Sequence, residues 1–176
     1  MKTNDKLVIR KPTLEDKEQI LEMVNEFRKH ESVLNGHGSI DKCESYEEWL
    51  EKLASYEDEK TLPEGRVLST QYVTVRVNDN KIVGLINARW YLNDFLKIHG
   101  GHIGDSIRPT ERNKGYATEQ IRLVLEEFKK RGVDKVLITC KEENIASAKT
   151  IEKNGGKFEN KVTYDGDTYR RYWITI

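Results

Sequence analysis

Hydrophobic and polar positions along this chain follow two periods, one typical of strands and one typical of helices. Between residues 67 and 77 apolar and polar residues alternate, so that Val73 and Val75 share one face. Between residues 117 and 128 apolar residues recur every three or four positions, which marks one face of a helix. We therefore expect an α/β (α+β) fold in which strands and helices bury apolar faces against each other.

Turn and capping residues divide this pattern into elements in the order βααβββαβαββ. Ser45 and Glu48 form a capping box, and Asp165-Gly166 is a typical hairpin turn. Residues 35–38, Asn-Gly-His-Gly, are predicted to be a flexible break, and residues 91–100 a connector. The predicted strands are residues 7–10, 67–77, 81–90, 102–108, 136–140, 157–164 and 168–176, and the predicted helices are residues 14–30, one that begins after Ser45, one that ends at Gly132, and residues 146–154.

Length, charge and cysteine content limit the class of protein. A chain of 176 residues suits one domain, which we expect to span residues 1–176. The 30 basic and 30 acidic residues cancel, so we expect no nucleic-acid partner. No apolar run approaches the roughly 20 residues of a membrane span, and no signal-peptide core is recognisable. Cys43 and Cys140 are too few for a disulfide framework or a zinc site, so we expect a cytoplasmic protein without a metal.

Residues 107–118 carry the strongest chemical signal. A strand-like run ends here in a short loop, and an amphipathic helix follows at once. The first N–H groups of a helix have no intrahelical partner, and the helix dipole adds about half a positive charge, so an anion is favoured there. Gly115 lets the backbone approach a ligand closely, and Arg112 and Lys114 add positive charge. We expect this loop to hold a pyrophosphate, although it matches neither a P-loop nor a GxGxxG motif.

The spacing Arg112-x-x-Gly115-x-Ala117, led by Ile107-x-Pro109, resembles motif A of the GNAT N-acetyltransferase superfamily. Asn144-x-x-Ser147 resembles motif B of the same family. The resemblance implies a mostly antiparallel, twisted sheet with a central parallel strand pair and about four flanking helices. It also implies that acetyl-CoA contacts Ile107, Arg112, Asn113, Lys114, Gly115, Tyr116, Ala117, Thr118, Asn144 and Ser147, with the pyrophosphate on motif A and the pantetheine arm beside motif B.

The resemblance implies an acetyl-CoA-dependent N-acetyltransferase. Such an enzyme would transfer the acetyl group directly to a primary amine of a small molecule or peptide in a ternary complex, as a monomer or a homodimer. The thioester would lie beside residues 103–107, where a bulged strand supplies an N–H donor to the oxyanion. The alternative is a non-catalytic acyl-CoA-binding regulatory module.

The catalytic groups are less clearly indicated than the cofactor site. Gly101 stands where several GNAT enzymes carry a base glutamate, and His102 and Asp105 are the nearest titratable residues. Strand alternation places these two on opposite faces, so we expect at most one to face the acceptor, and a base acting through water is the third possibility. Glu111 is expected to be solvated. Ile151 occupies the position of the usual motif B tyrosine, so the family's general acid is missing.

An acidic segment, residues 41–64, allows two interpretations. Its nine acidic residues outnumber its three lysines, which suits either the solvated face of a helix or the attraction of a cationic amine acceptor. The aromatic residues that are candidates to line the acceptor cleft, or to pack in the core instead, are Trp49, Tyr56, Trp90 and Tyr91.

Overall fold

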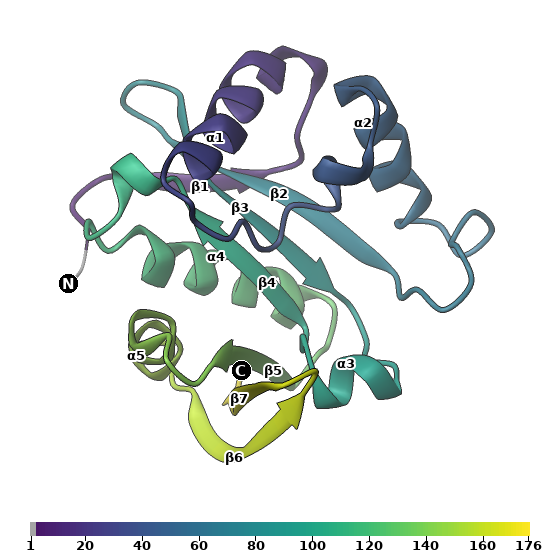
Figure 1. Cartoon of the computed structure of the whole chain (residues 1–176), viewed down its shortest axis with the longest axis vertical. Helices are drawn as coiled ribbons and strands as arrows, with labels where there is room; N and C mark the ends of the chain where they lie inside the picture. The colour runs from purple at the N-terminus through teal and green to yellow at the C-terminus, as the bar shows by residue number, and fades with distance from the viewer. Residues whose placement is uncertain (1–2) are drawn as a thin grey trace.

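The computed structural model describes residues 3–176 and contains two antiparallel sheets (Figure 1). The first sheet has the order β1-β2-β3-β4, and the second has the order β5-β7-β6. The strands are β1 (Leu7–Arg10), β2 (Ser69–Arg76), β3 (Lys81–Arg89), β4 (Ile103–Ile107), β5 (Lys135–Lys141), β6 (Lys157–Tyr164) and β7 (Asp167–Thr175). Each predicted strand is present, with its ends shifted by no more than about two residues.

Five α-helices complete the described part of the chain. They are α1 (Lys17–Lys29), α2 (Tyr46–Ser55), α3 (Asp94–Ile98), α4 (Tyr116–Lys130) and α5 (Ile145–Lys153). Ser45 caps α2 by accepting a hydrogen bond from the Glu48 N–H at 3.1 Å, as its position predicts. The five-residue helix α3 lies inside the predicted connector, where Asn93 caps it. The mixed α/β fold is confirmed, with one helix more than expected.

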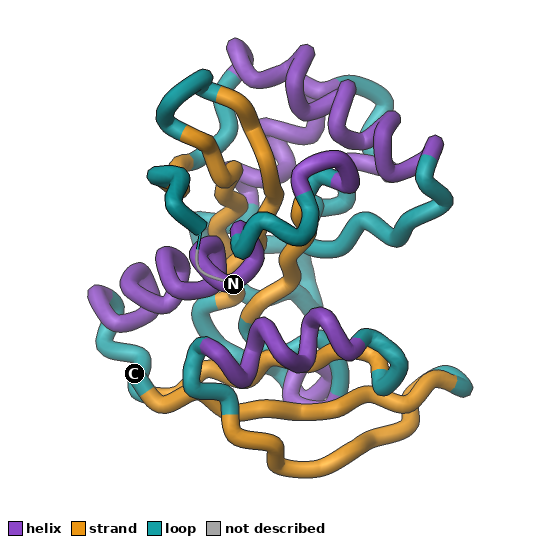
Figure 2. Tube along the Cα trace, turned by 90° about the vertical axis from the view of Figure 1, so that its left-hand side faces the viewer, coloured by secondary structure: helices purple, strands orange, loops and turns teal. Residues whose placement is uncertain are grey.

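The first sheet is covered by helices on both faces. Val73 and Val75 pack against α1 and α2, whereas Tyr72 and Ile86 pack against α4. This is the alternation that the sequence predicts for β2. Figures 1 and 2 show α4 between the first sheet and the second, so that one helix serves both. Among residues 3–176 we find no helix with the length and apolar character that a membrane crossing requires.

A β-bulge lies in β3 rather than in the strand that leads to the predicted cofactor loop. Thr74 pairs with Gly84 and Val75 with Ile82, so Val83 is the extra residue. A Cβ atom on Gly84 would lie 2.2 Å from Oε1 of Gln120, so glycine is required where α4 crosses the bulge. β4 pairs with β3 without a register shift, and the predicted bulge in residues 103–107 is therefore wrong.

The predicted central parallel pair, β4 and β5, is reduced to a contact at one end. The His102 N–H donates to the Leu137 carbonyl at 2.8 Å, and the Leu137 N–H donates to Nδ1 of His102 at 2.9 Å. We call this contact, made by Gly101, His102 and Leu137, the β4–β5 joint. Because an imidazole occupies the Leu137 N–H, that group is not available to a β4 carbonyl. Beyond the joint the two strands belong to different sheets, and β5 pairs with β7 instead.

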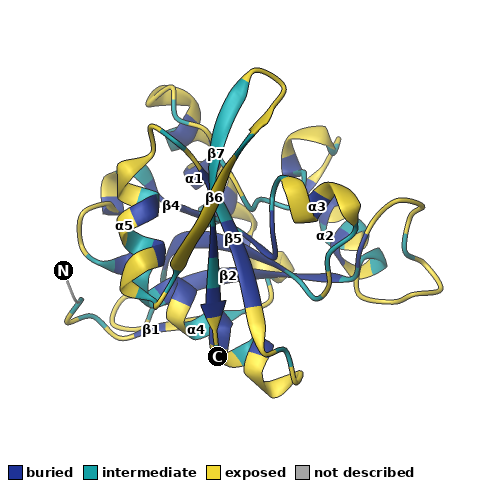
Figure 3. Cartoon of the chain, turned by 90° about the horizontal axis from the view of Figure 1, so that it is seen from below, coloured by how far each residue is buried: buried dark blue, intermediate teal, exposed yellow. Residues whose placement is uncertain are grey.

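The β6–β7 hairpin closes the second sheet and reaches α3. Its turn residues Asp165 and Gly166 both have positive φ, as the sequence predicts. The outer strand β6 is exposed along most of its length (Figure 3). The ring of Tyr164, at the end of β6, stacks on the ring of His99 at 4.9 Å. Phe95 of α3 packs edge-on against Tyr164 at 5.5 Å. The β6–β7 hairpin therefore packs against α3 through these aromatic side chains.

Candidate active site

The loop between β4 and α4 exposes a row of backbone N–H groups. Asn113 and Gly115 adopt left-handed conformations, with φ of 64° and 82°, and the helix begins at Tyr116. The Glu119 N–H bonds to the Gly115 carbonyl, so the N–H groups of residues 116–118 have no acceptor within the helix. These groups lie at the positive end of a 15-residue helix. We call residues 112–118 the cradle, because their backbone geometry suits an anion.

The basic side chains of the cradle are held by other parts of the protein. Arg112 donates to the hydroxyl of Ser32 at 2.8 Å and to the Ile107 carbonyl at 3.3 Å, and its guanidinium lies over the ring of Phe27. Lys114 pairs with Glu111 at 2.6 Å. The backbone N–H groups are therefore the immediately available donors, and a phosphate contact from Arg112 or Lys114 would require each side chain to leave its partner.

Glu111 is buried, so the expectation that it is solvated is wrong. Only 4% of the residue is exposed, and its carboxylate pairs with Arg76, Lys81 and Lys114 at 2.6–2.8 Å. Burial alone would raise its pKa, but the hydrogen bonds from Lys114, Lys81 and Arg76 outweigh burial and hold the pKa at about 2. The charged cluster fixes the turn that precedes the cradle.

Tyr116 packs its ring in the core. The residue is 1% exposed and lies with Leu7, Val83 and Ile107 in one apolar cluster. Its hydroxyl accepts a hydrogen bond from Arg76 at 3.0 Å and donates to Asp5. The side chain anchors the first turn of α4, and only its N–H group faces the cradle.

The motif B residues lie after β5, across the gap from β4. Asn144 caps α5 by accepting from the Ser147 N–H at 3.0 Å, and the Ser147 hydroxyl contacts the Cys140 thiol. Asn154, which the sequence did not single out by role, donates to the Thr118 carbonyl at 3.2 Å. This bond ties the end of α5 to the first turn of α4, so the motif B helix is positioned relative to the cradle.

His102 is a structural residue of the β4–β5 joint. The residue is 6% exposed, and its ring packs edge-on against Phe128 and Trp173, while Nδ1 accepts from the Leu137 N–H. Burial lowers its pKa to about 4, so the ring is neutral at pH 7. Because Nδ1 is already hydrogen-bonded and the ring is a weak base, these contacts argue against His102 as the general base.

Asp105 lies at the gap between β4 and β5. Burial raises its pKa to about 6, against a smaller effect of a hydrogen bond with Gln120 of α4. Burial is the main reason that the pKa of the Cys140 thiol is raised, and the charge of Asp105 adds a smaller contribution. Asp105 therefore lies near Cys140 of β5. Both His102 and Asp105 contact residues of α4, so the expectation of opposite faces is wrong. His102 precedes β4 and follows Gly101, whose φ of 61° breaks the alternation.

A cavity of about 240 Å³ opens where the loop after α1 and the end of α2 meet the start of β2, the end of β3 and α3. It is lined by Gly36, His37, Gly38, Ser39, Tyr56, Gly65, Arg66, Val67, Ser69, Asn87, Arg89, Asn93, Phe95 and Leu96. The loop formed by residues 35–38 lies directly on β4: Asn35 N–H donates to Ser106 at 2.7 Å, and a Cβ atom on Gly36 would be 2.0 Å from the Gly104 carbonyl oxygen. The segment predicted to be a flexible break is therefore packed, and its two glycines were the signal for a close backbone contact.

The chain matches a known protein family over most of its length. A family model described as an acetyltransferase (GNAT) domain matches residues 6–157, which include the cradle, β4, β5 and α5. The chain belongs to the GNAT acetyltransferase family. The resemblance inferred from the two motifs is confirmed.

A relative and two solved structures are similar to this GNAT protein. The uncharacterized N-acetyltransferase YnaD of Bacillus subtilis (strain 168) is 32% identical over 90 residues, which span 47% of this chain and about half, 53%, of that protein. RimL, a ribosomal L7/L12 α-N-protein acetyltransferase in complex with coenzyme A, has a TM-score of 0.68 at 16% identity, covering 100% of this chain and 97% of that one. A spermidine N-acetyltransferase chimera from Vibrio cholerae and hSSAT has a TM-score of 0.64 at 16% identity, covering 96% and 95%. At these identities the two structures show the shared fold.

Two further sequence features of the GNAT chain have a place in the structure. Ile151, at the position of the motif B tyrosine, is fully buried in the larger core cluster with Ala148. Acidic residues of the segment 41–64 are absent from the cavity lining. Of the four aromatic candidates only Tyr56 lines the cavity, since Trp49 is buried in the core, Trp90 packs on Phe128 and Tyr91 is outside the lining.

Proposed function

We propose that this GNAT protein is an acetyl-CoA-dependent N-acetyltransferase that transfers the acetyl group directly to a primary amine in a ternary complex. The observation that carries the proposal is the position of β4. The strand is roughly 17 Å long and leads towards the cradle, and Arg89, which lines the cavity, lies against it at Gly104. No other strand of residues 3–176 pairs with the outer edge of β4. A long, thin carrier with an anionic middle suits an unpaired strand edge that leads to an anion cradle.

The residues present suit coenzyme A. We propose that the N–H groups of residues 116–118 bind the diphosphate and that the free edge of β4 up to Ile107 meets the pantetheine arm. Asn144 and Ser147 follow β5, and the Ser147 hydroxyl contacts Cys140, whose thiol lies near enough to Asp105 of β4 to be affected by its charge. When bound, the thioester supplies the activated acyl group. These roles rest on the cradle geometry of Gly115, on the free edge of β4 and on the family membership.

The protein's own residues have to remove a proton and stabilise an oxyanion. At pH 7 only about one lysine-like amine in a thousand is neutral, so a proton acceptor near the amine is needed. Asp105, with a pKa near 6, is mostly ionised at neutral pH. Its side chain lies on the α4 side of β4, whereas Ser106 faces the loop that borders the cavity, so we propose that Asp105 takes the amine proton through a water at the free strand edge. Unpaired N–H groups of β4 can donate to the developing oxyanion.

The experiment that tests the proposal measures coenzyme A thiol release from acetyl-CoA across a panel of amines. The panel spans the acceptors after which the structural neighbours are named, a protein α-amine and spermidine, and extends to small amines. An enzyme releases thiol only with an accepted amine. A non-catalytic acyl-CoA-binding module, the rival suggested by the buried Ile151 and the absent strand glutamate, would bind acetyl-CoA by calorimetry yet release no thiol with any amine.

A further inference from the structure

The cavity beside β4 contains a cation without a counter-ion. Arg89, at the end of β3, uses Nη1 to donate to the carbonyls of Gly100 and Gly101, both at 3.0 Å. No ion pair involves Arg89 among residues 3–176. Burial, and to a smaller extent the charge of Arg66, lowers its pKa to about 10, which still leaves the guanidinium charged at neutral pH.

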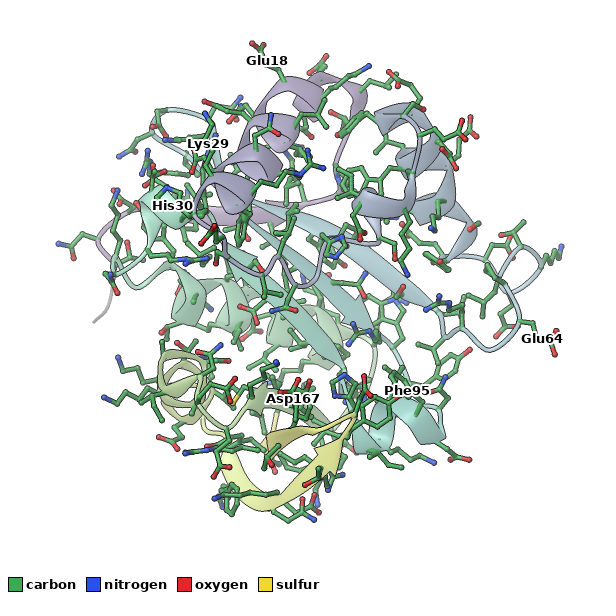
Figure 4. The ribbon with its side chains drawn as sticks, in the orientation of Figure 1. Glu18, Lys29, His30, Glu64, Phe95 and Asp167 are labelled. Carbon is green, nitrogen blue, oxygen red and sulfur yellow. The ribbon has the colours of Figure 1, made fainter. Side chains whose placement is uncertain are left out.

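The rest of the lining is basic or neutral. Arg66 also lines the cavity, and no aspartate or glutamate does. In the part of the chain that the structure describes, one carboxylate approaches a basic lining side chain: the exposed Asp41 lies 3.4 Å from Nδ1 of His37. Burial lowers the pKa of His37 below its usual value, so this imidazole is uncharged at neutral pH. Acidic residues next to the lining are directed elsewhere: Asp94 pairs with Lys97, and Glu64 lies at the outer end of its loop (Figure 4). A cationic polyamine would meet no carboxylate in this lining.

Arg89 is close to the strand on which transfer would occur. A Cβ atom on Gly104 would lie 3.2 Å from Nη2 of Arg89, so this nitrogen rests against the middle of β4. Neutral hydrogen-bonding side chains from Ser69, Asn87 and Asn93 surround the same space. A guanidinium presents a planar pair of donors that matches an oxyanion, and among residues 3–176 no acceptor is hydrogen-bonded to Nη2.

We propose that the acceptor is a small primary amine that also carries an oxyanion, a carboxylate or a phosphate, and that Arg89 binds this oxyanion while the amine faces β4. The proposal rests on the proposed N-acetyltransferase function. The cavity volume of about 240 Å³ suits a small molecule, and its charge selects against polyamines.

Matched acceptors test the charge requirement directly. Initial rates of thiol release are compared for β-alanine against propylamine, for 4-aminobutyrate against butylamine, and for phosphoethanolamine against ethanolamine. We expect the anionic member of a pair to have a kcat/KM at least about tenfold higher, because a hydrogen bond to a charged group is involved. The carboxylate and phosphate pairs identify which oxyanion is preferred. Equal rates within every pair, or a preference for the neutral amines or spermidine, would overturn the proposal.

Variants of Arg89 connect the charge requirement to this side chain. Arg89→Gln should lower kcat/KM for the anionic acceptor about ten- to hundredfold through KM, while acetyl-CoA affinity measured by calorimetry is unchanged. Arg89→Lys should retain part of the rate, because it keeps the charge but not the paired donors. Arg28→Gln removes the same charge from the exposed face of α1 and should have no effect. An equal loss for anionic and neutral acceptors would show a purely structural role through Gly100 and Gly101.

The two proposals can fail separately. If neutral amines are acetylated as well as anionic ones, the N-acetyltransferase assignment stands and the role of Arg89 is wrong. If no amine is acetylated, calorimetry with coenzyme A present decides the ligand class. Tighter binding of β-alanine than of propylamine, lost in Arg89→Gln, supports an oxyanion site without catalysis. Equal binding of the two removes both proposals.

Discussion

His102 and Asp105 show how two residues only three positions apart acquire different roles. Burial disfavours the charged form of both, lowering the pKa of the imidazole to about 4 and raising that of the carboxyl to about 6. The histidine is enclosed by Phe128, Trp173 and Leu137, and it stabilises the joint. Asp105 has a single side-chain partner and borders the gap. Neither environment is visible in the sequence, because the surrounding residues come from α4, β5 and β7.

Replacing Asp105 with asparagine should separate stability from activity. Between pH 3.8 and about 6 the native carboxyl holds a proton that the unfolded chain has lost, so wild-type stability falls as pH rises through this window. Asp105→Asn lacks this loss and should be about 1–3 kcal/mol more stable at pH 8, with the difference disappearing towards pH 4.

Thermal unfolding at pH 8 and pH 4.5 measures this difference, with the exposed Asp134→Asn as the control for the chemical change. If Asp105 accepts the amine proton, the same variant should lose about a hundredfold in kcat/KM. A variant that is no more stable than the wild type at pH 8 would show that the carboxylate carries no burial penalty.

For single residues, the sequence predicts which chemical groups can bind a ligand better than it predicts which side chains those groups contact in the folded protein. The free N–H groups of the cradle follow from Gly115 and the start of a helix, which are local. The partners of Arg112, namely Ser32 and Phe27, are 80 or more positions away, and Arg76 and Lys81 reach Glu111 from a different hairpin. Whether a carboxylate lies beside Arg89 depends in the same way on the whole fold, so the sequence does not show it.

A substitution at Gly115, just before α4 begins, tests the cradle most directly. Gly115→Asp places a negative charge and a side chain at a residue with φ of 82°, where a phosphate is expected. We expect acetyl-CoA affinity, measured by calorimetry, to fall at least a hundredfold. Gly132→Asp is the matched control, because Gly132 has φ of 73° just beyond the other end of α4 and open space around it. Normal affinity in Gly115→Asp would disprove the cradle.

The loop formed by residues 35–38 packs closely on β4 at Gly36. A methyl group at Gly36 would clash with the Gly104 carbonyl, whereas one at Gly65, which has a similar positive φ, would meet nothing within 4 Å. Gly65→Ala should cost about 1 kcal/mol from backbone strain alone. Gly36→Ala should cost about 3 kcal/mol and raise the acceptor KM, because the loop must lift away from the strand. Equal losses in chemical denaturation would show that the loop is free to adjust.

Element positions were predictable where their signals are local. Ser45 and the Asp165-Gly166 turn fix their elements through hydrogen bonds and φ angles within a few residues. The short helix α3 was missed because five residues are too few to show a helical period. The parallel pair was overestimated because its extent depends on the His102 side chain taking the Leu137 N–H, a contact across 35 positions.

At the scale of the molecule, two sheets share one helix and touch at one joint. The apolar stripe of α4 packs against both sheets, with Ile86 and Ile103 on one side and Ile138 and Tyr172 on the other. The family and the order of elements follow from sequence motifs. The division into two sheets and the charge of the cavity do not, since both depend on which distant side chains meet.

Binding of acetyl-CoA should stabilise both sheets together. A ligand at 100 times its Kd adds about 2.7 kcal/mol to the free energy of unfolding, which thermal unfolding will detect. Because the ligand would lie between β4 and β5, amide hydrogen exchange should slow in both strands and in the first turn of α4. Protection limited to β4, with β5 unchanged, would contradict a site in the gap.

The β4–β5 joint also has a consequence for acyl selectivity. The hydrogen bonds between His102 and Leu137 close the space between β4 and β5 at the end opposite the cradle, so a carrier bound along the free edge of β4 would end at this joint. A carrier whose diphosphate is anchored at one end delivers its terminal carbon at a set distance from the joint. Each added methylene of a longer acyl group would therefore clash with the hydrogen-bonded backbone of the joint. We expect the joint to limit the length of the acyl group and to favour the shortest acyl chains.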